Sequence, residues 1–166
     1  AAARNKLSSN NFGNIPIWIT ETGTYSGNPE TPGTDYQTEK QQASSLVKRY
    51  VSFLATGASK VFWAWGIKEG YGGPDDGDFW DFTGLIYDGK LNSDQGNNVK
   101  KLSYYTYKKL TSVLEGSDWN QIEKVRENNN NDGIYVYKFT RAGKPIWVAW
   151  DDNGASAEAV CPTEST

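Results

Sequence analysis

The side chains able to carry chemistry in this sequence are mainly carboxylates, hydroxyls and aromatic rings. The 166-residue chain has no histidine, which excludes a Ser-His-Asp triad, a histidine-based zinc site and an imidazole base. Its single cysteine, Cys161, excludes an internal disulfide and a site with several thiolate ligands. Aromatic residues are abundant, with seven Trp, ten Tyr and six Phe. Many lie in polar, glycine-rich stretches, where a ring can stack on the apolar face of a sugar.

Glu21 is the carboxylate whose position most favours catalysis. It follows residues 15–20, a short and almost continuously apolar run. The length and β-branching of this run predict a strand buried on both faces, as in a parallel sheet. Glu21 would then lie at the carboxyl end of that strand, although a strand-end glutamate by itself can equally cap a loop or pair with a lysine.

The elements that must position Glu21 are a strand, a helix and a second strand. Thr34 and Gln37 match a helix capping box, Gly57 is a natural helix stop, and residues 61–65 form a second apolar run. A one-sided apolar helix is predicted by the spacing of Ala43, Leu46, Val47, Tyr50, Val51 and Leu54. A strand–helix–strand unit of this size predicts parallel strands.

Beyond the second strand, the periodicity changes twice. After a long loop over residues 66–83, residues 84–91 predict a small hairpin around an Asp-Gly turn. Residues 99–114 have helical spacing and are closed by Gly116. Period-2 patterns then predict strands at 122–125, 133–140 and 145–150, the last two joined by a turn at 141–144. We therefore expect an α/β unit over residues 1–116 and a small antiparallel β-domain over 117–166.

Three stretches resemble the large clan of retaining (β/α)8-barrel glycoside hydrolases. Residues 17–23 (IWITETG) resemble the seventh barrel strand, in which a Thr-Glu-x-Gly signature carries the nucleophile. Residues 61–66 (VFWAWG) resemble the eighth strand, whose terminal Trp commonly forms the floor of the sugar site. Residues 82–90 and 101–108 resemble the stretch that leaves the final loop and enters the last helix. Their order and spacing also match those of the clan.

This resemblance implies the fold class of a partial (β/α)8 TIM barrel, the last two βα units, followed by a small antiparallel β-region. It implies a retaining hydrolase of a poly- or oligosaccharide with Glu21 as nucleophile, since active sites of such barrels lie at the carboxyl ends of the strands. The second carboxylate of the clan, the acid/base residue, usually follows an Asn, and this chain has no Asn-Glu pair. We therefore expect a C-terminal fragment that is inactive, or nearly so, alone.

Several aromatic and loop residues are candidates for sugar contact. Trp63 and Trp65 should share one strand face, where they either stack under a sugar or pack between barrel and helices. The remaining candidates lie in loops: Tyr25, Tyr71, Trp80 and Asp81.

Composition also limits the partners. The net charge of −3 argues against nucleic acid, and we expect the pairs 100–101 and 108–109 (both Lys-Lys) on solvated helix faces. No apolar run is long enough for a membrane helix. Residues 75–78 (DDGD) lack the spacing of a calcium loop, and no metal or cofactor is expected.

The partners expected are therefore a carbohydrate substrate and either the missing N-terminal barrel half or further copies of the chain, which would cover an exposed sheet edge. Secretion would be normal for such an enzyme. Two alternatives from other classes stay open: a non-catalytic carbohydrate-binding module, and a structural or interaction domain that keeps the motifs by inheritance.

Overall fold

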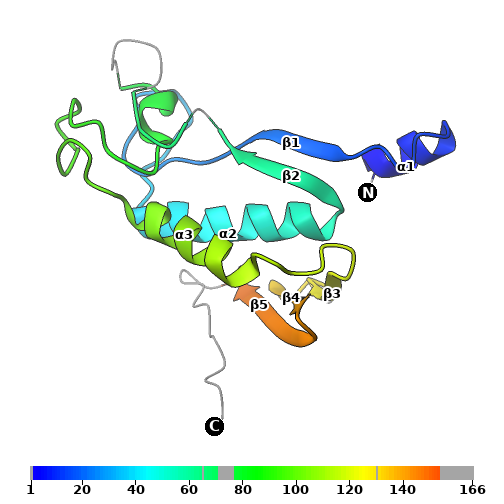
Figure 1. Ribbon diagram of the computed structural model, residues 1–166. Coiled ribbons are helices and arrows are strands. Elements are labelled where there is room, and N and C mark those ends of the chain that lie inside the picture. The colour runs from blue at the N-terminus through cyan, green and yellow to red at the C-terminus, as the bar shows by residue number, and fades with distance from the viewer. Residues whose placement is uncertain (1, 65, 71–76, 130, 154–166) are drawn as a thin grey trace, which may run out of the picture.

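The computed structural model describes residues 2–64, 66–70, 77–129 and 131–153, which form a mixed α/β structure with three α-helices and two sheets. The elements follow in the order α1 (Ala2–Ser9), β1 (Ile17–Thr22), α2 (Glu39–Ala55), β2 (Ala58–Trp63), the 3-10 helix η1 (Phe79–Phe82), α3 (Leu102–Leu114), β3 (Glu123–Glu127), β4 (Ile134–Arg141) and β5 (Lys144–Asp151). They form three layers: α2 and α3 lie between the pair β1–β2 and the sheet β3–β4–β5 (Figure 1).

The predicted strand–helix–strand unit is confirmed, because β1 and β2 pair in parallel. Leu46 and Tyr50 of α2 form a buried cluster with Leu85 beneath this sheet. Val61 and Trp63 of β2 pack against this cluster from one side, and three residues of α3 pack against it from the other: Tyr104, Tyr107 and Leu110. The apolar face of α2 therefore holds both strands and α3 in place.

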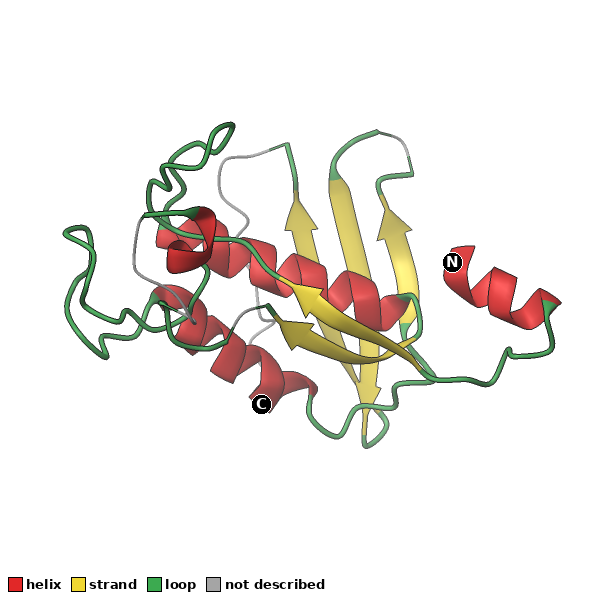
Figure 2. Cartoon of the chain, turned by 90° about the horizontal axis from the view of Figure 1, so that it is seen from above, coloured by secondary structure: helices red, strands yellow, loops and turns green. Residues whose placement is uncertain are grey.

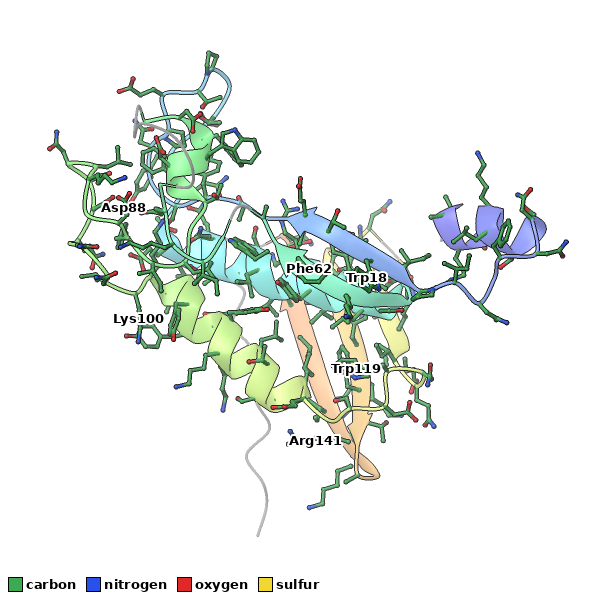
Figure 3. All side chains as sticks on the ribbon, turned by 45° about the horizontal axis from the view of Figure 1, so that its top comes forward. Trp18, Phe62, Asp88, Lys100, Trp119 and Arg141 are labelled. Atoms are coloured by element: carbon green, nitrogen blue, oxygen red, sulfur yellow. The ribbon has the colours of Figure 1, made fainter. Side chains whose placement is uncertain are left out.

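The prediction that residues 15–20 are buried on both faces is wrong. The opposite face of the β1–β2 pair carries Trp18, which is 51% exposed, and Phe62, which is 44% exposed. Their ring centroids lie 6.2 Å apart, and Figure 3 shows the two side chains together on the sheet. Within the described residues no further layer covers this face, which explains the exposure.

Helix α2 begins four residues later than the sequence pattern suggested. The N-cap is Thr38 and its capping-box partner is Gln41, because the Thr-x-x-Gln spacing occurs twice in succession. The Thr34 hydroxyl instead donates to the Thr31 carbonyl at 2.6 Å. The Gln37 amide oxygen accepts a hydrogen bond from Thr24 at 3.0 Å. The sequence offered two equivalent capping boxes, and the contact of Gln37 with the loop after β1 favours the second one, at Thr38.

The predicted hairpin at residues 84–91 is also wrong. Ile86 forms single bridges with Lys68 and with Lys100, and the amide of Tyr87 donates to Val99 O at 2.9 Å. Residues 88–97 form a longer loop, in which Gly89 has a φ of 80° and a Cβ would lie 2.6 Å from the backbone nitrogen of Asn97. The Asp88-Gly89 pair lies at a bend in this loop and joins no strands, because Ile86 pairs with Lys68 and Lys100 instead of with a residue just after the bend.

The C-terminal antiparallel sheet agrees with the period-2 prediction, in the order β3–β4–β5. The turn joining β4 and β5 lies at Ala142 and Gly143, with φ of 49° and 77°, as two-residue hairpins favour. The strands of this sheet run across the direction of β1 and β2 (Figure 2). Its buried side chains share one core with Val51 of α2 and Leu114 of α3; they are Tyr137, Phe139 and Trp150. The division at residue 116 stays a prediction.

Candidate active site

Glu21 lies in an irregular part of β1, and this irregularity exposes it. Regular alternation from Ile17 and Ile19, which are half-buried, would direct residue 21 toward α2. The pairing of β1 with β2 shifts register between Ile19 and Thr22, and Thr20 and Glu21 are both exposed. Such bulges place two successive side chains out of alternation. The Glu21 carboxylate is thus accessible at the carboxyl end of the strand.

The residues around Glu21 are held from both sides. Thr22 is buried, and its hydroxyl accepts a hydrogen bond from Arg49 of α2 at 3.4 Å. The Ala64 amide donates to the Thr22 carbonyl at 2.8 Å, which extends the parallel pairing past the end of β2. A Cβ at Gly23 would lie 3.4 Å from the Ala64 Cβ, so the two chains run close together at this point.

Among the described residues, the Glu21 carboxylate forms no hydrogen bond or ion pair, so its oxygens are available to a ligand. No group of three or more Asp, Glu or Cys in the described ranges is arranged to hold a metal ion. What this arrangement can do chemically is offer one solvent-accessible carboxylate, either as a nucleophile or as a hydrogen-bond acceptor for a hydroxyl.

Trp63 lies on the α2 side of the sheet, away from the exposed face. Its indole Nε1 donates to the Thr83 carbonyl at 2.9 Å, and its ring packs against the cluster of Leu46, Tyr50 and Leu85. This placement matches the packing role that the sequence left open for Trp63. Trp65, its predicted partner on the same face, lies outside the described residues.

The loop residues predicted to contact sugar differ in accessibility. Tyr25 is buried, donates from its hydroxyl to Asp35 O at 2.6 Å and packs its ring against Phe79. Asp81 is buried too, and its carboxylate accepts a hydrogen bond from the amide of Gly77 at 2.9 Å. Both therefore have structural roles in the loop. Trp80 is 44% exposed and so offers part of its ring to a ligand; Tyr71 lies outside the described residues.

A buried polar network that the sequence did not indicate joins the loops at this end. Gln42 of α2 is fully buried, and its amide nitrogen donates to Thr24 O at 3.1 Å and to Thr83 O and Gly84 O at 3.3 Å. Its amide oxygen accepts a hydrogen bond from Ser103 at 2.8 Å. The only local signal was a polar residue within the apolar stripe of the helix.

Lys101 forms the second part of this network, and its predicted place on a solvated helix face is wrong. Its side chain is 0% exposed and forms an ion pair with Glu69, whose side chain is 1% exposed. The Lys101 ammonium also donates to Ser26 Oγ at 2.9 Å and to Phe82 O at 3.2 Å. One cation therefore connects the loops that follow both parallel strands. Lys100, by contrast, is exposed as expected (Figure 3).

Burial shifts the titration of both partners toward their neutral forms. It raises the pKa of Glu69 to about 8, although the nearby charge of Lys101 opposes this shift. Burial also lowers the pKa of Lys101, again against the effect of its partner. Glu69 Oε2 has no hydrogen-bond partner among the described residues, which is consistent with a carboxylate that is poorly solvated.

Comparison with known proteins gives no assignment: no protein-family model and no curated protein matches this sequence. None of the helices in the described part of the chain has the length and apolar character needed to span a membrane.

Proposed function

We propose that this chain is the C-terminal part of a retaining glycoside hydrolase that acts on a poly- or oligosaccharide. The observation that carries the proposal is the exposed carboxylate of Glu21 at the carboxyl end of a parallel strand. That is the end at which barrel enzymes place their active sites. The sequence around Glu21 supports it, because residues 20–23 (TETG) carry the signature described above.

In this proposal β1 and β2 are two neighbouring strands of a (β/α)8 barrel. Their parallel pairing, with α2 between them in sequence and packed beneath them, has the arrangement of a barrel βα unit. The side chains of Trp18 and Phe62, exposed on the other face, would then be covered by the remaining barrel strands or by further copies of the chain. We propose no nucleic-acid or membrane partner.

The proposed reaction uses Glu21 as nucleophile. A carboxylate oxygen attacks the anomeric carbon and forms an ester, while the bond from that carbon to the leaving oxygen breaks and the leaving group takes the electron pair. An acid supplied from outside this chain donates a proton to the leaving oxygen. Water then attacks the same carbon, losing its proton to that group, and the Glu21 carboxylate is released.

The test is intact-mass spectrometry after treatment with dinitrophenyl 2-fluoroglycosides of glucose, mannose and xylose. Dinitrophenolate leaves without protonation, so the first step does not require the acid that this chain lacks. We expect a covalent adduct that maps to Glu21, is absent in Glu21→Gln and persists in Glu30→Gln, in which another exposed carboxylate is changed. Absence of any adduct, or an adduct that persists in Glu21→Gln, would overturn the assignment of the nucleophile.

A further inference from the structure

A cleft at the other end of the sheet from Glu21 has features of a second site. We call it the Trp119 cleft; its volume is about 780 Å³, within the range of about 300–1,000 Å³ that is usual for small-molecule sites. It lies between the ends of α2 and α3 and the amino end of β2. Its lining includes Leu54, Val61, Leu110, Leu114, Trp119 and Asn120.

The lining divides into an apolar floor and a polar rim. Buried and half-buried side chains form the floor, chiefly Leu54, Val61, Leu110 and Leu114. Exposed hydrogen-bonding groups form the rim: Ser59, Lys60, Thr111, Glu115 and Asn120. Lys60 lines the rim, but its ammonium lies over the Trp18 ring, 4.4 Å from the ring centroid, so the other charged group of the rim is the Glu115 carboxylate. Trp119 adds an indole that is 47% exposed.

The segment that presents Trp119 is held in place. The amide of Asp118 donates to Thr140 O at 2.8 Å, and its carboxylate accepts a hydrogen bond from the amide of Asn120 at 3.0 Å. The Trp119 ring packs edge-on against Phe139, with ring centroids 6.4 Å apart. Figure 3 shows Trp119 on this turn between α3 and the C-terminal sheet. A site fixed before binding loses less conformational entropy when a ligand arrives.

We propose that the Trp119 cleft binds a neutral oligosaccharide. A sugar has an apolar C–H face that stacks on an indole and hydroxyls that need donors and acceptors, and this cleft offers both. A purely apolar ligand would displace water from the rim groups of Glu115 and Asn120 without replacing its hydrogen bonds. An anionic ligand would meet the Glu115 carboxylate. The site does not depend on Glu21 and goes beyond the proposed hydrolysis.

The test is calorimetric titration of the whole chain with cellohexaose, mannohexaose and xylohexaose. We expect at least one to bind, and Trp119→Ala to weaken its affinity by roughly fivefold or more, since one aromatic stacking contact contributes about 1 kcal/mol. Trp147→Ala is the matched control, because Trp147 is a similarly exposed indole, at 42%, on β5. It should leave the affinity unchanged. Asn120→Ala, which keeps the indole, should weaken binding to a smaller extent.

Other results would overturn this proposal. Binding of none of the three sugars does so, as does equal binding by wild type and a folded Trp119→Ala. Binding lost in Glu21→Gln but kept in Trp119→Ala would place the sugar at the candidate active site instead. Sedimentation that shows self-association abolished by Trp119→Ala, with no sugar bound, would make the cleft a contact between copies.

Discussion

Replacing Glu69 by Gln tests whether the buried Lys101–Glu69 pair controls how stability depends on pH. Burial raises the pKa of Glu69 from 4.5 to about 8, so the folded protein holds this proton more tightly than the unfolded chain does. The resulting contribution to stability is fully present below pH 4.5 and is lost as the pH rises to about 8. Glutamine cannot titrate, so Glu69→Gln should lose this dependence.

The magnitude follows from the width of this pH window. One proton contributes about 1.4 kcal/mol per pH unit to the free energy of unfolding. Between pH 4.5 and 8 wild type should therefore lose on the order of 4 kcal/mol of stability relative to Glu69→Gln. The charges of Asp88 and Asp94 are present in both proteins and affect mainly the absolute values. Glu69→Gln also removes a charge that raises the pKa of Lys101, and this change favours the variant as the pH rises, in the same direction.

The assay is urea denaturation followed by circular dichroism at intervals of half a pH unit from 4.5 to 9. Glu30→Gln, which changes an exposed carboxylate, is the control and should follow wild type. Lys101→Met should extend the loss of stability above pH 8, because the charge of Lys101 lowers the pKa of Glu69. If wild type and Glu69→Gln show the same pH dependence, Glu69 is not held in its protonated form by burial, and the reasoning fails.

Three further features, a close contact, a helix cap and a buried amide, are tested by substitution and denaturation. Gly27→Ala should lower the free energy of unfolding by more than about 2 kcal/mol, because φ is +123° and a Cβ would lie 2.4 Å from a phenyl carbon of Phe82. Gly33→Ala is the control: φ is +83° but the space around it is open, so the loss should be only about 1 kcal/mol. Thr38→Ala should cost about 1 kcal/mol and Thr34→Ala less, and the reverse order would contradict the observed N-cap. Gln42→Leu should lower the free energy of unfolding by about 1–3 kcal/mol and speed amide hydrogen exchange at residues 82–84. Unchanged exchange there would show that the hydrogen bonds of Gln42 do not hold this loop.

The sequence by itself determined the elements whose signals are local. Apolar spacing marked α2 and α3, period-2 alternation marked β4 and β5, and the Ala142–Gly143 turn needed only residues that tolerate positive φ. Parallel pairing of β1 and β2 followed from the helix between them, because a short turn cannot join parallel strands. The position of Glu21 at the end of β1 was therefore predictable as well.

Only the tertiary structure decided how these elements use their side chains. The bulge that exposes Glu21 depends on how β1 pairs with β2, and the choice of Thr38 over Thr34 depends on contacts with the loop after β1. Lys101 reads as a surface lysine, yet its partner Ser26 lies 75 residues away in sequence. Periodicity reports which face of an element is apolar, whereas burial of a charge depends on groups that converge from distant segments.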